Sequence, residues 1–539
     1  MKQLFTNWKI LLPLIFLLAF VLRVFDVGKN PTFISDEASI GYNAYSVLKT
    51  GKDEWGSFLP LAFKSFGEYK LPIYIYSAAP IIAIFGLTEF AVRLPSIFFG
   101  SLTVLALYFL TRELLPKKGY LIPLLASFLL TINPWHIQVS RMALEANLGL
   151  FLTVLGGLFL LRARKNSKFY FFAFPVFVLT LYTYNSCRVF TPLFLLFYFF
   201  FSRAEIRVQS LAKPAIIAFL IVLPLIFSGF SGSSQRLYKV GIFNNPGIIS
   251  QINEQRGECL KQSGFVCSLR FSKPTIYSEV FIKNYLSHFS LDFLFKAGAG
   301  LSQYTMPVQG MLYFWELPFL LIGIIYLFWS KRIFIFLLAW LLIGPLANSF
   351  TGTAHPVRSL LMLPVFPVLT AVGLGLTFEI FGKRKYLNYI FPFLFILLIT
   401  VSSGSFLFKY FTYYPLVSNW NWQMGYENLY QDLSKLEPTT GKIYVSKFYG
   451  EPHIFYLFEN KYDPKSYQKN TGVVRYDRED LWTNVDQIGK YYFVQDPKQI
   501  VLGDNDILVV SPQEGSFGGE ILESVKYNNG EIAFLIYRK

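Results

Sequence analysis

Residues 387–408 read LNYIFPFLFILLITVSSGSFLF, and this stretch decides the fold. It contains no charged side chain, and Lys383, Arg384 and Lys385 precede it with only Tyr386 between. An apolar run of about 20 residues is long enough to cross a bilayer as a helix. Basic residues collect on the cytoplasmic side of such helices. We therefore predict a membrane helix that starts at the cytoplasmic surface near residue 387.

Comparable apolar runs recur throughout the first 410 residues. The composition agrees, because 53% of the chain is hydrophobic and only 15% is charged, whereas soluble domains average about 25% charged residues. The predicted fold class is a polytopic α-helical membrane protein with about 11–13 transmembrane helices. The candidate spans are residues 9–27, 91–113, 120–134, 147–162, 169–185, 189–202, 214–230, 311–330, 333–350, 359–381 and 387–408.

The basic residues lie mainly in short loops between these runs. The net charge is +16, yet residues 411–539 hold 13 Lys and Arg residues against 17 Asp and Glu residues. A nucleic-acid-binding protein gathers its basic residues on a soluble face, so no nucleic-acid partner is expected. The pattern instead places the basic loops and the N-terminus in the cytoplasm. These loops carry Arg112, Lys117, Lys118, Arg162, Arg164, Lys165, Lys168, Arg203, Arg207, Lys213, Lys331, Arg332, Lys383, Arg384 and Lys385.

With those loops inside, the alternate loops face outward across the cytoplasmic membrane. Residues 71–87 are apolar but short, and Pro80 and Gly86 interrupt them. Counting them as a span would invert every later basic loop, so a re-entrant or interfacial element is predicted. An additional true span stays the alternative. The predicted outside segments are residues 28–90, 135–146, 186–188, 231–310, 351–358 and 409–539.

Two domains are predicted, a transmembrane domain at residues 1–410 and an extracytoplasmic domain at residues 411–539. The second has the mixed pattern of a small α/β domain. Asn529-Gly530 is a strong hairpin-turn signal before its last strand. The strand-like stretches are residues 442–446, 491–494, 507–510 and 532–537.

Two adjacent carboxylates, Asp36 and Glu37, follow the first span at the start of the first outside loop. A carboxylate at this place can take a proton from a hydroxyl group that attacks a reacting carbon. The same pair is also common in solvated loops, and Ser35 or Asp36 could cap a helix that follows. Both interpretations stay open at this point.

Further charged residues lie at the predicted outer boundary of the membrane. Lys70 can bind a lipid phosphate as a point charge, or simply extend toward the interface; Glu68 stands two residues before it. His355 and Arg358 lie in the same short outside loop, where they can bind a phosphate. The alternative is that they are ordinary polar residues of an exposed loop. An Arg on the outer side runs against the charge bias.

Arg141 and Glu145 lie in the second outside loop, four residues apart. On one helix face they would form an ion pair, in the weaker of the two orientations. The functional alternative makes Glu145 a second carboxylate of a site, because ionisable groups at the boundary of a membrane bundle are costly and often functional.

The chain has three Cys and four His residues. Cys259 and Cys267 fall in a long outside loop, where either a disulfide or two free thiols are compatible with the sequence. No His and Cys spacing predicts a tetrahedral zinc site. No cofactor is expected with certainty, and a divalent cation bound by Asp36, Glu68 or Glu145 stays an alternative.

The sequence contains no nucleotide-binding glycine motif and no nucleophile elbow. Nothing in it predicts nucleotide-driven transport. If the protein uses a sugar donor outside the cell, that donor cannot be a cytosolic nucleotide sugar, and a lipid-linked phosphosugar is then the chemically sensible choice.

Together these features resemble the GT-C glycosyltransferases of the protein O-mannosyltransferase and lipid A aminoarabinose transferase type, over most of residues 10–410. No single motif is specific, but their order and spacing together are. The motifs are Asp36-Glu37, Lys70-Leu71-Pro72, Arg93-Leu94-Pro95-Ser96, Ser140-Arg141 with Glu145, and His355-Pro356-Val357-Arg358.

The resemblance implies an inverting, single-displacement transfer of a monosaccharide from a polyprenyl-phosphate donor to a protein, lipid or glycan acceptor. Asp36 is then the base, or orients the acceptor, and Glu37 supports it or binds the donor sugar. Lys70 holds the lipid phosphate with help from Arg358 or His355. The resemblance also implies an acidic pocket, with or without a metal, and two supporting arginines. These residues are Glu68 and Glu145 for the pocket, and Arg93 and Arg141 for the support.

The chain departs from these families in three places. The aminoarabinose enzymes have Lys-Pro-Pro where this chain has Lys70-Leu71-Pro72, and their acid adjoins that Lys, whereas Glu68 is one residue further away. Their second-loop acid is commonly Asp, and here it is Glu145. These departures weaken the metal assignment more than the transferase assignment.

Three alternatives to a monosaccharide transferase are compatible with the sequence. A transporter or flippase for a lipid-linked glycan needs repeats and intramembrane charges, which are not evident. A non-catalytic scaffold predicts that the carboxylates can be replaced without loss of function. A polymerase or ligase of surface polysaccharide stays within the enzyme class.

Overall fold

The computed structural model describes residues 7–203, 208–228, 241–260, 264–300, 303–307, 309–417, 423–479 and 482–539. The chain forms two compact units. The first, called the helical unit, comprises Met1–Arg23, Phe98–Ser140 and Glu145–Gly404. The second, called the mixed unit, comprises Val24–Ile97, Arg141–Leu144 and Ser405–Lys539.

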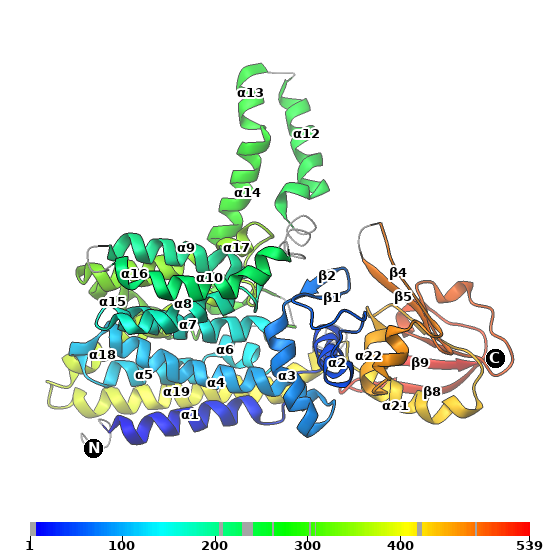
Figure 1. Ribbon diagram of the computed structural model, residues 1–539. Helices are drawn as coiled ribbons and strands as arrows, with labels where there is room; N and C mark the ends of the chain where they lie inside the picture. Colours follow the sequence, from blue (N-terminus) through cyan, green and yellow to red (C-terminus); the bar gives the residue numbers. More distant parts are fainter. Residues whose placement is uncertain are drawn as a thin grey trace. The chain divides into compact units, whose positions relative to one another are not determined.

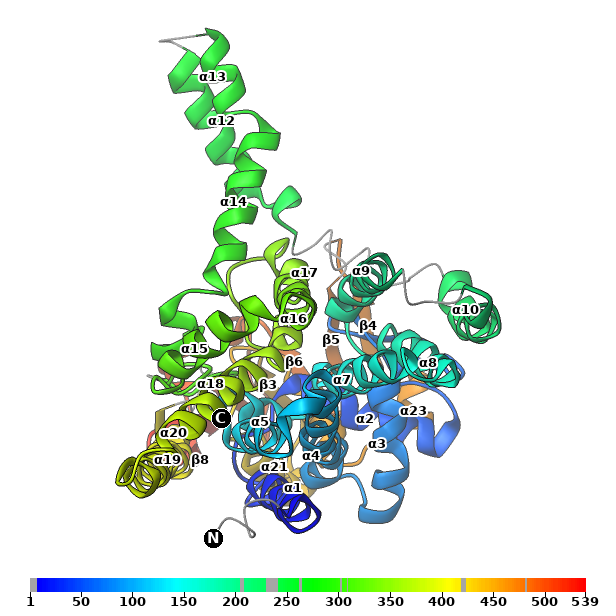
Figure 2. The same cartoon turned by 90° about the vertical axis from the view of Figure 1, so that its left-hand side faces the viewer.

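Long apolar helices make up most of the helical unit, and they run alongside one another (Figures 1 and 2). Every one of the eleven predicted spans overlaps one of these helices. α4 and α19 also extend into the mixed unit. The helices are α1 (Trp8–Val24), α4 (Glu89–Leu114), α5 (Leu121–Ile132), α6 (Pro134–Ser140), α7 (Glu145–Ala163), α8 (Tyr170–Thr180), α9 (Asn185–Ser202), α10 (Ala212–Phe227), α15 (Glu316–Trp329), α16 (Lys331–Ile343), α17 (Leu346–Ser349), α18 (Val365–Phe381) and α19 (Leu387–Thr412).

Six helices in the described part of the chain are long and apolar enough to cross a membrane. α5 and α6 form a seventh candidate, bent by 59°. Residues 135–140, predicted as the start of an outside loop, belong to α6, whose seven side chains are all buried. The predicted polytopic fold class is confirmed, whereas the full number of crossings and the sidedness of the termini stay predictions.

A glycine contact joins α15 to α18. A Cβ atom added at Gly373 would lie 1.9 Å from the Phe319 carbonyl oxygen, and one at Gly323 would lie 2.0 Å from the Leu369 carbonyl oxygen. The two backbones therefore approach so closely that only glycine fits, which is the usual way in which membrane helices pack tightly.

Replacing Gly373 with valine is expected to lower the stability of the helical unit by at least about 3 kcal/mol, because the clash is with backbone and cannot be relieved by a rotamer change. The thermal unfolding midpoint of the purified protein measures this. Gly404→Ala is the control, since a Cβ atom there meets nothing within 4 Å. Equal midpoints for the two variants would contradict the prediction.

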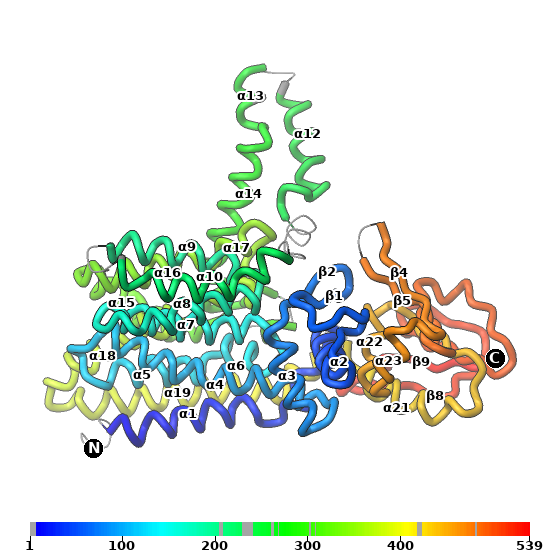
Figure 3. The backbone as a smooth tube through the Cα atoms, in the orientation of Figure 1, coloured from blue at the N-terminus to red at the C-terminus, as the bar shows by residue number. Residues whose placement is uncertain are grey.

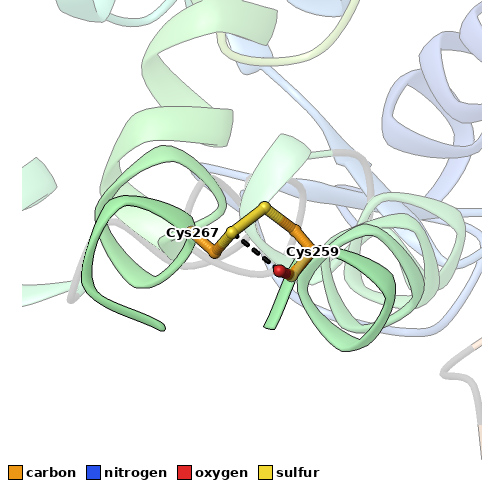
Figure 4. Close-up of a disulfide and its surroundings, with 2 residues drawn as sticks. All are labelled: Cys259 and Cys267. Atoms are coloured by element: carbon orange, nitrogen blue, oxygen red, sulfur yellow. Dashed lines mark hydrogen bonds between the residues drawn. A yellow bond between two sulfur atoms is a disulfide. The ribbon is translucent and has the colours of Figure 1, made fainter. Parts of the chain in front are cut away.

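A helical hairpin also belongs to the helical unit. It consists of α12 (Pro246–Leu260), α13 (Gly264–Arg270) and α14 (Lys273–Ser287). Cys259 and Cys267 form a disulfide across it, with their Cα atoms 5.5 Å apart (Figure 4). The sequence was compatible with a disulfide or with two free thiols, and the structure contains the disulfide. Cys187 is buried and free.

The mixed unit begins with α2 (Ser35–Thr50), followed by a hairpin of β1 (Phe63–Ser65) and β2 (Glu68–Lys70), and by α3 (Pro72–Phe85), as Figure 3 traces. α3 has only 14 residues, contains Pro80, and ends at Gly86, whose φ is 75°. At about 1.5 Å per residue it is shorter than the hydrocarbon core of a bilayer. Whether it crosses the membrane stays a prediction.

A mixed sheet forms the C-terminal part of this unit, as predicted. Its strand order is β4-β5-β6-β3-β7-β9-β8, with β3 parallel to β6 and β7 and the other neighbours antiparallel. The four predicted strands are β3, β6, β7 and β9. The strands are β3 (Ile443–Ser446), β4 (Val473–Asp477), β5 (Thr483–Ile488), β6 (Tyr491–Val494), β7 (Ile507–Val510), β8 (Glu520–Lys526) and β9 (Ile532–Arg538).

Helices of the C-terminal region pack against α2 inside the mixed unit. A Cβ atom at Gly41 would lie 2.6 Å from the Phe458 ring, and the Tyr42 hydroxyl donates to the Tyr462 carbonyl at 3.2 Å. The segment predicted as the first outside loop is therefore part of the same compact unit as the C-terminal sheet. The domain boundary predicted at residue 411 stays a prediction. The helices of this region are α20 (Tyr414–Val417), α21 (Tyr426–Leu436), α22 (Pro452–Glu459) and α23 (Pro464–Gln468).

Candidate active site

The first turn of α2 carries both predicted carboxylates, Asp36 and Glu37. Acidic side chains are favourable there, because the N-terminus of a helix carries a partial positive charge. The backbone N–H of Ser35 donates to Gln423 Oε1 at 2.9 Å, and Gln423 Nε2 donates to the Tyr449 carbonyl at 2.7 Å. The C-terminal region thus fixes the start of the helix that bears the carboxylates.

Asp36 and Lys70 form an ion pair. The Lys70 Nζ atom lies 2.5 Å from Asp36 Oδ1, and the Lys70 side chain is 5% exposed, whereas that of Asp36 is 39% exposed. The ammonium group is therefore largely enclosed by protein, and the carboxylate is open to solvent. Two residues that are 34 positions apart in the sequence therefore meet in the fold.

The β1–β2 hairpin delivers Lys70 to this position. Lys70 is the last residue of β2 and pairs with Phe63 of β1. The turn residues Phe66 and Gly67 have φ values of 45° and 87°, and positive φ at both central residues is the requirement of a tight hairpin turn. Phenylalanine is rare in that conformation, which is why the sequence did not predict this hairpin.

Glu37 is fully buried and held by Arg93 at the start of α4. Arg93 Nε donates to Glu37 Oε1 at 2.8 Å, and Arg93 Nη2 donates to Glu37 Oε2 at 2.6 Å. Both side chains are 0% exposed. The backbone N–H of Ala143 also donates to Glu37 Oε1 at 2.7 Å. This forked, charge-assisted geometry is among the strongest hydrogen-bonding arrangements in proteins.

Arg93 and Arg141 also bind backbone carbonyls that precede α2. Arg93 Nη1 donates to the carbonyls of Val27 and Pro31, each at 2.6 Å. Arg141 donates to the carbonyls of Phe25 and Asn30, at 2.7 and 2.5 Å. Both predicted supporting arginines therefore shape the chain that leads into the carboxylate-bearing helix.

Glu54 was not among the predicted site residues, although it lies in the same unit. Its side chain is buried, its backbone N–H donates to Asn43 Oδ1 at 3.1 Å, and Asn43 Nδ2 donates to Glu54 Oε1 at 3.1 Å. Burial raises the pKa of the Glu54 carboxyl to about 7. Asp53 and Glu54 are adjacent, and Trp55 follows them, in a segment predicted to lie outside. This pattern could have indicated Glu54 from the sequence.

Arg475 of β4 holds the loop that contains Glu54. Its Nη1 atom donates to the Glu54 carbonyl at 3.1 Å. Its guanidinium group lies 4.0 Å from the Trp55 ring centroid and 4.4 Å from that of Tyr467. Stacking between two aromatic rings adds to the strength of such contacts. A residue of the C-terminal sheet therefore positions the loop beside the candidate site.

The raised pKa of Glu54 predicts a pH-dependent stability. The folded unit keeps the Glu54 proton at pH values between the ordinary pKa of 4.5 and about 7, whereas the unfolded chain has released it. The contribution of Glu54 to the free energy of unfolding is therefore largest at low pH and is lost as the pH rises through about 7. Glu54→Gln, which keeps an acceptor for Asn43 and cannot ionise, is expected to stabilise the protein by up to about 3 kcal/mol near pH 8 and to be neutral near pH 4.

Thermal unfolding midpoints at the two pH values test this expectation. The control is Glu523→Gln, because Glu523 is exposed on β8. A stabilisation by Glu54→Gln that is the same at both pH values would show that the effect is not ionisation.

The remaining predicted residues lie on three segments of the chain. Glu68 is the first residue of β2 in the mixed unit. Glu145 is the first residue of α7, and His355 and Arg358 lie in the loop after α17, all in the helical unit. Arg358 Nη1 donates to Thr351 Oγ1 at 3.2 Å, and His355 Nδ1 accepts from the Val357 N–H at 3.2 Å. Their participation with Lys70 in phosphate binding stays a prediction.

No group of three or more His, Cys, Asp or Glu side chains that could hold a metal ion occurs among the described residues. The two central carboxylates have cationic partners instead, namely Lys70 for Asp36 and Arg93 for Glu37. Whether a divalent cation binds at Asp36, Glu68 or Glu145 stays a prediction.

The chain is similar to known proteins in part of its sequence and in its fold. Residues 70–228 match the model of the family described as dolichyl-phosphate-mannose-protein mannosyltransferase. A comparison with curated proteins finds no match by sequence.

Solved structures resemble the chain as well. ArnT from Cupriavidus metallidurans, solved with undecaprenyl phosphate, is 12% identical with a TM-score of 0.53, and the match covers 98% of each chain. The oligosaccharyltransferase AglB from Archaeoglobus fulgidus, solved with an inhibitory peptide and a dolichol-phosphate, is 15% identical with a TM-score of 0.51. That match covers 84% of this chain and 64% of AglB, so the chain spans less than two thirds of AglB. A second structure of the same AglB, solved with Zn and sulfate, is 16% identical with a TM-score of 0.50, over 83% of this chain and 61% of AglB.

Proposed function

The chain has the GT-C fold, as its motifs predicted, and we propose that it transfers a monosaccharide from a polyprenyl-phosphate donor to a hydroxyl group of an acceptor. The observation that carries this proposal is the ion pair between Asp36, which is open to solvent, and the enclosed Lys70. The bound lipid phosphates in the ArnT and AglB structures support the donor class. The reaction takes place on the outer face of the cytoplasmic membrane.

Asp36 acts as the general base in this proposal. The acceptor hydroxyl gives its proton to the Asp36 carboxylate while its oxygen forms a bond to the anomeric carbon of the sugar. The bond from that carbon to the phosphate oxygen breaks at the same time, and attack opposite the leaving group inverts the anomeric configuration. Proton transfer of this kind contributes about 10²- to 10⁴-fold to a rate.

Lys70 balances the charge during the same step. The donor phosphate is a diester with one negative charge, and the departing polyprenyl phosphate is a monoester that gains a second. Asp36 loses its negative charge when it accepts the proton, which weakens its attraction for the Lys70 ammonium group. The ammonium group can then stabilise the new charge on the leaving group. One enclosed cation thus serves the base before the step and the phosphate after it.

Glu37, Arg93 and Arg141 position the helix that carries Asp36. Their contacts lie within the protein, and both oxygens of Glu37 already accept hydrogen bonds. We therefore assign Glu37 to support of the site rather than to proton transfer. Arg358 and His355 are proposed as further ligands of the phosphate, and Glu68 and Glu145 as acidic residues at the margin of the acceptor site.

The donor sugar is proposed to be mannose first, because the matching family is described by a mannose donor. Purified protein is incubated with radiolabelled polyprenyl-phosphate mannose and a crude envelope extract. Transfer of label to protein, lipid or glycan establishes the activity and the acceptor class. A panel of pentose and hexose carriers follows in the same assay, and absence of transfer from every carrier would overturn the proposal.

A further inference from the structure

The helical hairpin of α12, α13 and α14 has one polar side and one apolar side. From Ser250 to Glu258, every exposed residue of α12 is polar or a glycine. α13 and α14 instead carry large apolar side chains that are more than half exposed. A group of exposed apolar side chains indicates a surface that another apolar phase covers. These side chains are Val266 at 64%, Leu269 at 56%, Ile282 at 54% and Leu286 at 59% exposed.

The hairpin also buries apolar side chains of its own. Ile252 of α12 and Ile276 of α14 are 3% and 5% exposed. The disulfide between Cys259 and Cys267 links α12 to α13. The exposed apolar side chains of α13 and α14 therefore form a second apolar surface, separate from the one that the hairpin buries.

The base of α14 lies against α16, near the end of α16 that is remote from its basic residues. The Tyr285 hydroxyl donates to the Leu342 carbonyl at 2.9 Å, whereas α16 begins at Lys331. Because basic residues collect on the cytoplasmic side, this contact lies at the outer surface of the membrane. Leu342 is itself 40% exposed. Ile282 and Leu286 lie within three residues of Tyr285, so they extend the exposed apolar surface of a membrane helix.

The direction of the hairpin agrees with this position. It runs across the direction of the membrane helices of the helical unit in both views (Figures 1 and 2). In Figure 1, α13 and α14 lie on the side of the hairpin toward the marked N-terminus, and α12 lies on the other side. A hairpin that follows the bilayer surface in this orientation turns its apolar side to lipid and its polar side to water.

We propose that the helical hairpin lies on the outer surface of the bilayer, with the exposed apolar side chains of α13 and α14 in lipid and α12 in water. Interfacial helices bury their apolar face about 5–10 Å into the boundary between headgroups and acyl chains. Lys273 and Lys283 are exposed on α14, and long basic side chains of this kind reach lipid headgroups while their stems stay in apolar surroundings.

The same helix holds the loop that carries Arg358. Asn284 Nδ2 donates to the Ser349 carbonyl at 3.1 Å, and the Ala354 N–H donates to Ser287 Oγ at 2.8 Å. A docked α14 therefore keeps this loop at the membrane surface, where the phosphate of a lipid-borne donor lies. Docking of the hairpin does not depend on the proposed function, whereas the use of the loop in donor binding does.

Fluorescence quenching of the full chain in lipid nanodiscs tests the docking. A nitrobenzoxadiazole label is attached to Leu269→Cys or Ile282→Cys, with Glu254→Cys on the polar side as the matched control. Cys187 is buried and the other two cysteines form the disulfide, so the wild type is the labelling blank. Doxyl groups on the lipid chains are expected to quench the label at residues 269 and 282, and aqueous iodide is expected to quench it at residue 254.

A double substitution tests which side chains hold the hairpin down. Leu269→Asp/Leu286→Asp is expected to shift the equilibrium away from the docked hairpin by at least about tenfold, because two leucine side chains then leave the apolar phase. The measurement is the loss of doxyl quenching at Ile282→Cys. Ser250→Asp/Asn253→Asp on α12 is the control and is expected to leave that quenching unchanged.

Three results would overturn the proposal. The first is iodide quenching at residues 269 and 282 that is as strong as at residue 254. The second is doxyl quenching that survives the double leucine substitution. The third is protection from both quenchers that occurs only in nanodiscs holding two copies of the chain, because a second copy would then be what covers the apolar side.

Discussion

Replacing Asp36 with asparagine is expected to lower the transfer rate by about 10²- to 10⁴-fold, the contribution of a positioned general base. Asparagine has nearly the same shape but cannot accept the proton of the acceptor hydroxyl. The Asp36 side chain is 39% exposed, but the substitution removes the negative charge that faces the enclosed Lys70 side chain, which is 5% exposed. The stability of the variant is therefore measured together with its transfer rate. The initial rate of label transfer from the carrier that serves as donor measures the effect.

The specificity of this result depends on a carboxylate control. Asp504 is exposed in the C-terminal region and lies apart in sequence from every residue of the candidate site, so Asp504→Asn is expected to transfer at the wild-type rate. Thermal unfolding midpoints of both variants, measured alongside, confirm that they are folded. Full activity of Asp36→Asn would remove Asp36 from the mechanism and, with it, the charge balance assigned to Lys70.

The local sequence placed Asp36 and Glu37 together, and only the family resemblance assigned them different roles. Adjacent residues of a helix point about 100° apart, because a turn takes 3.6 residues. Asp36 consequently faces the open side of the unit and Lys70, whereas Glu37 faces inward to Arg93. Which of the two carboxylates is buried depends on how α2 is oriented relative to its neighbours. The identity of two adjacent residues does not determine that orientation.

The membrane fold was predictable because its signal is local. Each apolar run, such as residues 387–408, is itself long enough to define a helix, and each of the eleven runs overlaps one. The same holds for β3, β6, β7 and β9, whose residues are strongly apolar. β4 and β5 were missed because they are polar strands at or near the sheet edge, as Arg475 and Asp477 of β4 illustrate.

The contacts that shape the candidate site are long-range and were not predictable in the same way. Arg475 binds a carbonyl 421 residues earlier in the chain, and Gln423 binds the N–H of Ser35 across 388 residues. Nothing in either local sequence marks these pairs. The family resemblance was able to indicate Asp36, Lys70 and Arg93, because it rests on the order of motifs and does not require the contacts that hold them.

Replacing Glu37 with glutamine is expected to lower the stability of the protein by about 3–5 kcal/mol, the usual cost of removing one partner from a buried ion pair. Both side chains are 0% exposed, so the Arg93 charge is left without its counter-charge in a dry environment. Glutamine cannot accept hydrogen bonds from Arg93 at both positions and from Ala143. The thermal unfolding midpoint is the measurement.

A double-mutant cycle with Arg93→Gln isolates the interaction from the rest of the site. Removing both charges is expected to cost less than the sum of the single substitutions, because neither leaves a lone buried charge. The exposed pair of Lys64 and Asp477, 2.6 Å apart, provides the control: Asp477→Asn is expected to cost at most about 1 kcal/mol. If Glu37→Gln costs no more than Asp477→Asn, the buried pair does not hold the Asp36 helix in place. The positioning role of Glu37 would then be lost, while the role of Asp36 as base would still rest on its own substitution.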